Sequence, residues 1–574
     1  MDQSLSGRRW VGPGVEAERA AAALAQRSDL PLAVAQVLAR RGVPHEEVAS
    51  YLAPSLRELL PDPRNLRDME RAASRFVQAL AARERIAVFA DYDVDGASSA
   101  ALLLDWIRQM GHSATLYVPD RIDEGYGPND AAMAALAAKH DLIVCVDCGT
   151  LSHGPIEAAV GADVIVLDHH LGGETLPAAH SIVNPNRQDE DGALTHLCAA
   201  GVVFLMLVEA GRQLRDAGRT GPDLMGMLDL VALGTVADVA PLIGVNRAFV
   251  RQGLRVMARR ARIGLATLAD ISRMDTAPNA YHLGFLLGPR INAGGRIGAA
   301  DLGARLLFTQ DSHEAAALAE RLDRLNTERR DIEASVRAAA QSQSQARGQD
   351  GALVWAAGAG WHPGVVGIVA ARLKEATHRP SVVIGIEDGI GKGSGRSVTG
   401  IDLGASIQRL AAEGLLIKGG GHKMAAGLTV AEDKIDAAMA RLTELMEKQG
   451  AHMLGASDLR VDGALMPGAA TLDLVDLIEQ AGPFGAGASA PRFAFADMRI
   501  RFAKRVGDTH LKISFDDGIG PPMDAICFGA FDTQLGAALD GHAGAHFHLA
   551  GRLDVNEWRG RRSVQLRLED AARV

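Results

Sequence analysis

The stretch FADYDVDGASSA (Phe89–Ala100) places the carboxylates of Asp91, Asp93 and Asp95 directly after an apolar run. The preceding residues, 85–90, have the composition of a buried β-strand. Carboxylates this close together raise each other's pKa and destabilise the fold. A bound cation would remove that cost. The stretch therefore predicts a metal site at the end of a buried strand.

The segments around this stretch alternate between two patterns. Short apolar runs, typical of buried strands, are RIAVFAD, ATLYVPD, LIVCVDC and ADVIVLDHH. The segments between them, such as SSAALLLDWIRQMG and NDAAMAALAAKH, have helical periodicity. Alternating strands and helices predict an α/β fold with a mostly parallel sheet that is covered on both faces.

The chain has 574 residues, so we expect several domains. Leucine, isoleucine and valine at spacings of three, four and seven over 318–336 predict a long amphipathic helix. A second α/β pattern follows it, and the last segment reads as a small β-barrel or sandwich. The predicted parts are an N-terminal helical region (1–80), an α/β domain (81–245), a helical connector with the long helix (246–348), a second α/β domain (349–453) and a β-barrel domain (454–574).

Composition limits the function classes only loosely. The net charge of −10 argues weakly against a general nucleic-acid binder, but a local basic groove remains compatible with it. Cys145 and Cys148 form a CxxC without a second pair at zinc spacing, so we interpret them as small core residues. The sequence contains no signal-peptide pattern and no membrane-spanning run, and we expect a cytoplasmic protein.

Further acidic residues and histidines follow other apolar runs. VDCG contains Asp147, LDHH contains Asp168, His169 and His170, and GTVADV contains Asp238. The carboxyl ends of strands in an open α/β sheet meet in one crevice, so these side chains are expected to converge. A single Asp after a strand is more often a cap or turn residue.

A calcium loop is the alternative for DxDxDG, but its twelfth position requires Glu and is Leu102 here. Carboxylates with one or two imidazoles suit Mn²⁺ or Mg²⁺. The number of candidate ligands exceeds the need of one ion, which favours two ions that share carboxylates. Such a site is typical of phosphoester hydrolysis.

The motifs DYDVDG, VDCG, DHH and GTVADV, in this order, resemble those of the DHH phosphoesterase superfamily. Downstream motifs resemble the RecJ family of bacterial single-strand-specific DNA exonucleases: GPRINAGGR (288–296), WHPGVVGIVAARL (361–373), GKGSGRS (391–397), KGGGHKMAAG (418–427) and GPFGAG (482–487). GPRINAGGR has a glycine where the family commonly has a second alanine. No proposed ligand is affected.

The resemblance implies roles for individual residues. The metal ligands would be Asp93, Asp95, Asp147, His169 and Asp238. Asp91 would support them and His170 would contact the scissile phosphate. The two glycine-rich segments are expected to be loops that bind the terminal phosphate of the substrate, and a helix is expected to begin near KGGGHKMAAG. The predicted substrate-binding residues are Arg290, Asn292, Arg296, Ser394, Arg396, Gly420, Gly421 and His422, although the first three could instead cap local helices.

The implied activity is a 5′-to-3′ exonuclease on single-stranded DNA that releases nucleoside 5′-monophosphates with two Mn²⁺ or Mg²⁺ ions. The implied context is DNA recombination and repair, with a RecQ-type helicase and a single-strand binding protein as partners, and we expect a monomer. The β-rich tail resembles an oligonucleotide-binding (OB) fold. Its basic residues, Arg492, Arg499, Arg501, Lys504 and Arg505, either contact the DNA strand or form an ordinary solvated strand face.

Three alternatives remain at this point. A smaller DHH enzyme would hydrolyse short oligonucleotides or cyclic dinucleotides, but the extra terminal regions favour a polymer substrate. An inorganic pyrophosphatase of the superfamily lacks the GGGH-type segment found at 419–422. A non-catalytic replication scaffold can lose ligands, whereas every proposed ligand position is filled here.

Overall fold

The computed structural model describes residues 4–121, 123–348, 351–451, 458–558 and 560–574. The predicted boundary at 348/349 adjoins residues 349–350, and the one at 453/454 falls within residues 452–457, so both lie at segments outside the described residues. The chain forms two compact units. We call residues 61–241 with 249–455 the two-sheet unit, and residues 1–60, 242–248 and 456–574 the barrel unit. Each is described by itself.

The first sheet of the two-sheet unit has five parallel strands in the order β3-β2-β4-β5-β6. The strands are β2 (Ile86–Ala90), β3 (Ala114–Tyr117), β4 (Leu142–Val146), β5 (Asp163–Leu167) and β6 (Ser181–Val183). The first four are the apolar runs predicted as strands. Since all five run in one direction, their carboxyl ends lie at the same edge of the sheet.

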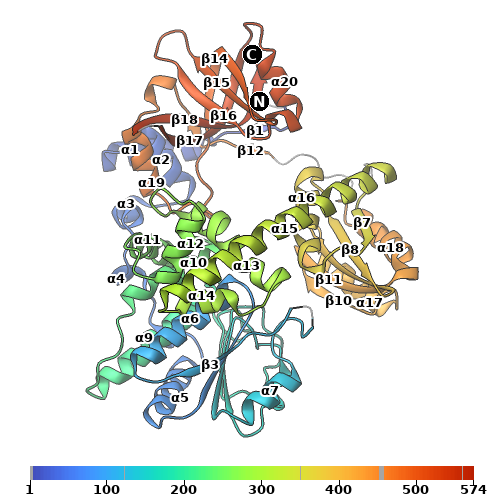
Figure 1. The fold of residues 1–574 in the computed structure, drawn as a ribbon. Helices are drawn as coiled ribbons and strands as arrows, with labels where there is room; N and C mark the ends of the chain where they lie inside the picture. The colour runs from blue at the N-terminus through green and yellow to red at the C-terminus, as the bar shows by residue number, and fades with distance from the viewer. Residues whose placement is uncertain (1–3, 122, 349–350, 452–457, 559) are drawn as a thin grey trace. The chain divides into compact units, whose positions relative to one another are not determined.

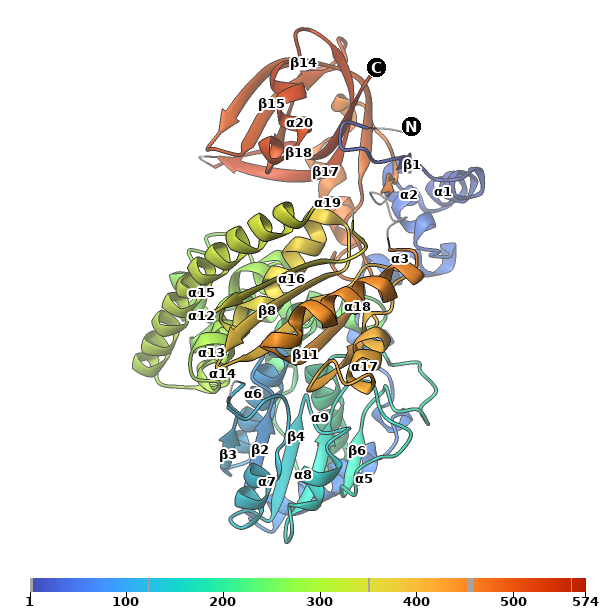
Figure 2. The ribbon, with the colours of Figure 1, turned by 90° about the vertical axis from the view of Figure 1, so that its right-hand side faces the viewer.

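Helices cover both faces of this sheet (Figure 2). They are α5 (Met69–Ala81), α6 (Val94–Gln109), α7 (Asp130–Ala137), α8 (His153–Glu157) and α9 (Ala199–Asp216). Helices α7 and α8 bury their apolar side chains against one face of β2, β4 and β5. Helices α5, α6 and α9 pack against the sheet and against one another. The predicted doubly covered parallel sheet is confirmed.

A helical region follows the first sheet. Its helices are α10 (Leu228–Ala237), α11 (Val245–Ala258), α12 (Ile263–Ile271), the π-helix η4 (His282–Leu287), α13 (Gly288–Ile297), α14 (Leu302–Phe308) and α15 (Ser312–Arg347). Helix α15 is the predicted long amphipathic helix and has 36 residues (Figure 1). It packs on α12, α13 and α14, and further along on α16 and β7 of the second sheet.

The second sheet has the order β10-β11-β9-β8-β7 and is antiparallel except for the β7–β8 pair. Its strands are β7 (Val354–Ala359), β8 (Ser381–Glu387), β9 (Ile390–Arg396), β10 (Lys418–His422) and β11 (Ala425–Ala431). Helix α16 (Pro363–Thr377) packs with α15 on one core, whereas α17 (Leu403–Ala412) and α18 (Ile435–Lys448) pack on the other.

The prediction that GKGSGRS and KGGGHKMAAG are loops is wrong, because they form β9 and the β10–β11 hairpin. Strand periodicity explains the glycines of β9. A Cβ atom on Gly393 would lie 2.9 Å from Ile384 and from Leu428, so these core side chains occupy the space. The alternate residues, Ser394 and Arg396, therefore project from the opposite face of the strand.

The barrel unit contains a six-stranded sheet that closes through a β14–β17 pairing. Its strands are β13 (Gly463–Ala464), β14 (Phe493–Val506), β15 (His510–Asp516), β16 (Met523–Cys527), β17 (His546–Trp558) and β18 (Arg561–Arg573), with α19 (Leu472–Gln480) and α20 (Gln534–Asp540) beside them. The predicted C-terminal barrel is confirmed, and with it the predicted fold class.

The N-terminal residues belong to the same unit as the barrel. They form β1 (Trp10–Val11), α1 (Val15–Ser28), α2 (Leu32–Arg40), α3 (Val48–Leu52) and α4 (Leu56–Leu59). Strand β1 pairs with β12 (Leu459–Arg460), and the indole nitrogen of Trp10 donates to the buried Asp570 at 2.8 Å. Val34 and Leu38 of α2 share one core with Phe495 and Phe547 of the barrel.

Two composition-based predictions can be compared with this fold. All four cysteines are buried and unpaired, as expected for small core residues. Across the described ranges, we find no helix with both the length and the apolar character that a membrane crossing needs.

Candidate metal and phosphate site

The DYDVDG segment joins β2 to α6 and is held by its own carboxylates. Asp93 is the N-cap of α6, and its Oδ1 accepts hydrogen bonds from the amides of Asp95 (2.8 Å) and Gly96 (3.1 Å). A Cβ on Gly96 would lie 2.3 Å from the carbonyl oxygen of Asp91, so only glycine fits this close approach. The cap and the glycine fix the three acidic side chains at the sheet edge.

Asp95 is buried and lies at the N-terminus of α9. Its two carboxylate oxygens accept hydrogen bonds from the amides of Ala199 (2.6 Å) and Ala200 (2.9 Å). A helix N-terminus favours a negative charge, so α9 stabilises the Asp95 carboxylate in the protein interior.

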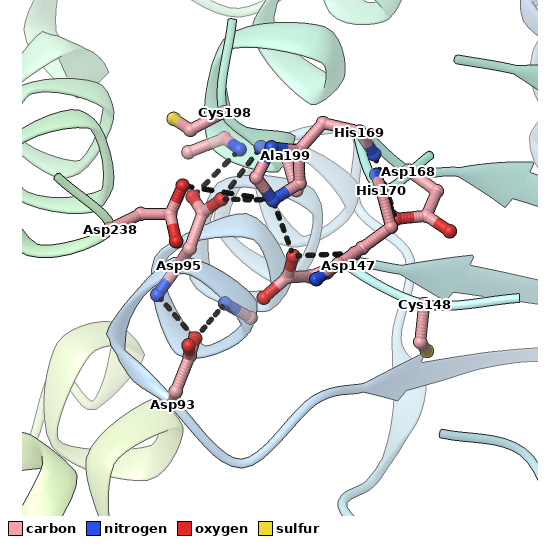
Figure 3. Close-up of polar contacts among 12 residues, drawn as sticks. Asp93, Asp95, Asp147, Cys148, Asp168, His169, His170, Cys198, Ala199 and Asp238 are labelled. Carbon is pink, nitrogen blue, oxygen red and sulfur yellow. Dashed lines mark hydrogen bonds and ion pairs between the residues drawn. The ribbon is translucent and has the colours of Figure 1, made fainter. Parts of the chain in front are cut away.

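His169 lies at the centre of the acidic cluster (Figure 3). Its Nε2 atom is 3.2 Å from Asp147, 3.7 Å from Asp238 and 3.8 Å from Asp95. Asp147 and His169 follow strands β4 and β5, whereas Asp238 caps the C-terminus of helix α10. The structure thus brings together residues that are up to 147 positions apart in the sequence, from Asp91 to Asp238.

The carboxylates of this cluster are costly to ionise together. Burial, and then the charges of neighbouring carboxylates, raise the pKa of Asp91 and of Asp147 well above the ordinary value. Burial also raises the pKa of Asp238 to about 8, with further contributions from Asp95 and Asp93. Such shifts are typical of a site built for a cation.

Three buried atoms at the cluster centre have no hydrogen-bond partner in the described part of the chain: Asp91 Oδ1, Asp147 Oδ1 and His169 Nε2. Buried polar atoms are rarely left without a partner. Side-chain atoms fall into three overlapping groups within 4.8 Å, namely Asp91/Asp93/Asp147, Asp95/His169/Asp238 and Asp147/His169/His170. Asp147 and His169 are each shared by two groups, which fits more than one divalent ion with bridging ligands.

His170 lies beside the cluster and contacts Asp168. The Asp168 carboxylate contacts His170 Nδ1 at 2.8 Å and accepts from the amide and hydroxyl of Thr150. Burial opposes the charge on His170, but the hydrogen bond to Asp168 outweighs it and raises the pKa of His170 to about 9. Burial likewise opposes the Asp168 charge, yet bonds from His170 and Thr150 hold its pKa below the ordinary range. His170 is therefore cationic at neutral pH.

A cluster of arginines lies in the same unit. Arg296 is half-buried on α13, and its Nη1 donates to the carbonyl oxygen of Gly364 at 3.2 Å. Burial, then the charges of Arg121 and Arg329, lower the pKa of Arg296 to about 10. Burial and Arg121 also lower the pKa of Arg396, whose Nη1 donates to Ser394 Oγ at 3.0 Å.

Among the described residues, Arg121, Arg296 and Arg396 form no ion pair with a carboxylate. The Arg121 guanidinium lies 5.1 Å from the centre of the Tyr92 ring, inside the DYDVDG segment. Guanidinium groups that repel one another beside a metal cluster suit a phosphate ligand. The arrangement can therefore hold a phosphodiester next to divalent ions.

Other predicted substrate-binding residues have local partners. Arg290 donates to Asp323 of α15 (2.9 Å) and to the carbonyl oxygen of Leu286 (2.7 Å). Asn292 Oδ1 accepts from the amide of Val94 at 3.1 Å and so supports the start of α6. Both residues thus contact neighbouring elements, and their role in substrate binding stays a prediction.

The remaining predicted residues lie on strand β10. Gly420 pairs with Gly427, which in turn pairs with Ser394 on β9. A Cβ added to Gly420 or Gly427 would meet no atom within 4 Å, so the strands expose their backbone there. His422 is exposed, and its Nδ1 accepts from the amide of Met424 at 3.3 Å.

The basic residues of β14 are largely neutralised. Arg499 and Arg501 contact the buried Asp516, and Arg492 contacts Glu569. The Arg505 guanidinium stacks over Phe531, with 3.7 Å to the ring centre. This strand therefore carries less free positive charge than its sequence indicates.

Two residues of the site, Arg121 and Tyr126, were not predicted from the sequence, and both lie in the segment DRIDEGYG. The Tyr126 hydroxyl lies 3.0 Å from the carbonyl oxygen of Asp147 and 3.0 Å from His170 Nδ1. The available signal was the position of this segment directly after the β3 strand, at the carboxyl edge where ligands bind.

Comparison with known families assigns three parts of the chain. The "DHH family, N-terminal domain" matches residues 85–235, the "DHHA1 domain" matches 350–448, and the "RecJ OB domain" matches 461–570. These regions contain the first sheet with the acidic cluster except for Asp238, the second sheet, and most of the barrel.

Similar proteins cover nearly the whole chain. The single-stranded-DNA-specific exonuclease RecJ of Dickeya dadantii is 40% identical over 94% of this chain and 96% of its own length. The corresponding protein of Escherichia coli is 38% identical over 95% and 96%. The crystal structure of RecJ with Mn²⁺ from Thermus thermophilus has a TM-score of 0.81 and 29% identity, and covers 98% of this chain and 79% of that one.

Proposed function

The chain belongs to the RecJ family of single-stranded-DNA-specific exonucleases, and from this premise we propose that it hydrolyses single-stranded DNA from the 5′ end and releases nucleoside 5′-monophosphates. The observation that carries the proposal is the cluster around His169, where three carboxylates lie within 3.8 Å of one imidazole nitrogen. The activity is that of a metal-dependent exodeoxyribonuclease.

The cofactor is Mn²⁺ or Mg²⁺, since the similar Thermus thermophilus structures contain one or the other. Asp93, Asp95, Asp147, His169 and Asp238 are the proposed ligands, with Asp91 in support. When bound, such ions lower the pKa of water and neutralise charge on a phosphate.

The side chains around the ions bind and orient the strand. Asp168 raises the pKa of His170, and His170 would donate a hydrogen bond to an oxygen of the scissile phosphate. Arg121, Arg296 and Arg396 would bind phosphates of the terminal nucleotides, and Ser394, Gly421 and the open backbone of Gly420 would complete the terminal-phosphate site. A phosphate site at a fixed distance from the ions would set both the polarity and the one-nucleotide step.

The barrel adds a second DNA contact in this proposal, because OB folds bind single strands. We also propose the division of the chain into the five predicted parts, a cytoplasmic location and a monomeric state. The proposed biological role is in recombination and repair, with a single-strand binding protein and a RecQ-type helicase as partners. These proposals are supported by membership of the family.

An end-label assay tests the function. Single-stranded DNA labelled at either end is incubated with the protein and Mn²⁺, with EDTA as the control. We expect immediate release of labelled mononucleotide from the 5′ end only, and none with EDTA. Initial release from the 3′ end would refute the polarity, and turnover of dinucleotides without digestion of long strands would refute the polymer substrate.

A further inference from the structure

Tyr126 connects two residues of the metal site. Its hydroxyl lies 3.0 Å from the carbonyl oxygen of Asp147, to which it donates. The same oxygen is 3.0 Å from His170 Nδ1 and 3.2 Å from His170 Nε2, and the two rings meet edge to face with centres 5.4 Å apart. A phenol that donates to a carbonyl keeps its lone pairs free, so the Tyr126 oxygen can share the Nδ1–H that His170 also donates to Asp168, which leaves the Nε2–H available.

The loop that carries Tyr126 is anchored independently of the metal site. Glu124 accepts from the hydroxyl of Tyr117 at 2.6 Å and from the amide of Asp120 at 2.7 Å. Gly125 and Gly127, on either side of Tyr126, have φ values of +88° and +75°. The backbone therefore turns sharply at both neighbours of Tyr126, and this directs its side chain towards β4 and β5.

Asp168 alone does not fix the orientation of the His170 ring. A single hydrogen bond at Nδ1 leaves the ring free to tilt about that contact, and His170 is otherwise half-exposed, with 46% of its side chain accessible. The Tyr126 hydroxyl and ring edge contact the imidazole from a second direction.

We propose that Tyr126 is a positioning residue that holds the His170 imidazole in its orientation toward the scissile phosphate. The inference rests on the proposed function, because it assigns Tyr126 to the same reaction. Tyr126 acts through His170, and its hydroxyl is the group that matters.

A double-mutant cycle of Tyr126→Phe and His170→Ala tests the proposal with single-turnover hydrolysis of 5′-phosphorylated DNA. In the wild-type background, the loss of orientation is expected to lower the rate by about 10- to 100-fold. In the His170→Ala background, Tyr126→Phe is expected to lower the remaining rate by less than about twofold, because residues in one network do not act additively. The Mn²⁺ concentration for half-maximal rate is expected to stay within about twofold of wild type in Tyr126→Phe.

Tyr117→Phe is the matched control, since it removes a hydroxyl that anchors the same loop but does not reach His170. It is expected to leave the rate within about twofold of wild type. The proposal would be overturned if Tyr126→Phe lowered the hydrolysis rate by the same factor in the wild-type and His170→Ala backgrounds. It would also be overturned if Tyr117→Phe lowered the rate as much as Tyr126→Phe does. If wild-type protein had no Mn²⁺-dependent exonuclease activity, the proposed function itself would fail. If the wild-type enzyme were active but the effects of the two substitutions were additive, only the role of Tyr126 would fail.

Discussion

Replacing Asp147 by Asn is expected to stabilise the metal-free protein while it abolishes hydrolysis. Asp147 is buried, its Oδ1 has no hydrogen-bond partner among the residues that the structure describes, and Asp91 and Asp93 have ligand atoms within 4.8 Å of its own. Without a cation, the fold tolerates this carboxylate at a cost. Asparagine keeps the shape of the side chain and removes its charge, so the substitution removes both the electrostatic destabilisation and the metal-binding carboxylate.

The geometry sets the magnitude of the effect. Two unit charges separated by 4.8 Å repel by about 3.5 kcal/mol at an effective dielectric constant of about 20. Partial protonation relieves some of this repulsion in the wild type. We therefore expect Asp147→Asn to raise the free energy of unfolding by about 1–3 kcal/mol, which corresponds to a rise of about 2–6 °C in the midpoint of thermal unfolding.

The pH dependence has a definite sign. Burial and neighbouring charges raise the pKa of Asp147 in the folded state, and burial raises that of Asp238 to about 8. A folded-state pKa above the unfolded value means that the folded state binds more protons, so stability is lost as the pH rises through the folded pKa. The stabilising effect of Asp147→Asn is therefore expected to be larger at about pH 9 than at about pH 5.

Thermal unfolding of EDTA-stripped proteins at both pH values measures this effect, and Asp168→Asn is the matched control. Asp168 is equally buried, but its hydrogen bonds to His170 and Thr150 lower its pKa. A lowered pKa contributes stability above the unfolded value, so Asp168→Asn is expected to lose about 1–3 kcal/mol at both pH values. Destabilisation of the metal-free protein by Asp147→Asn would refute the electrostatic reasoning.

Three further predictions concern the phosphate site, the helix beside the metal loop, and the cation. Arg396→Ala should lower the preference for a 5′-phosphate over a 5′-hydroxyl end by about 10- to 100-fold, since a charge-assisted hydrogen bond contributes about 1.5–3 kcal/mol, while Mn²⁺ activation is unchanged; loss of Mn²⁺ activation would contradict it. Gly295→Ala should slow hydrolysis, because its Cβ would lie 2.7 Å from the Tyr92 carbonyl oxygen. Gly294→Ala should retain most activity, because the nearest atom to its Cβ would be 3.1 Å away. Equal rates for the two variants would exclude this packing argument. Mn²⁺ at about 100 times its dissociation constant should stabilise the EDTA-stripped protein by about 2.7 kcal/mol in calorimetry, and this shift should be absent in Asp147→Asn.

Much of the fold could be predicted because its signals are local. The apolar runs that became β2, β3, β4 and β5 are short and bounded by polar turns, and the apolar stripe of α15 continues over several helical turns. The grouping of residues 1–60 with the barrel could not be predicted in the same way. It depends on α2 side chains that meet barrel strands more than 400 residues later, as Leu38 does with Phe495.

The glycine-rich segments show where local reasoning fails. Glycine favours turns, so GKGSGRS reads as a loop when it is taken by itself. In the structure, Ile384 and Leu428 fill the space that a side chain at Gly393 would need. Tertiary packing therefore decides the conformation, and the residues that produce it lie on other strands of the sheet.

The same reasoning explains why the ligands of the site were predictable and the groups around them were not. The ligands are recognisable in the sequence because they are ionisable residues that directly follow apolar segments, where a protein core does not tolerate them. They are Asp91, Asp147, His169 and Asp238. Tyr126 lies in a polar loop where a tyrosine needs no explanation, and its importance arises from two contacts, to Asp147 and His170, that the sequence does not encode locally. A site of this kind has two layers: charged ligands that must be conspicuous because they are costly without a cation, and neutral residues that orient them at little cost. Only the first layer is visible before the fold is known.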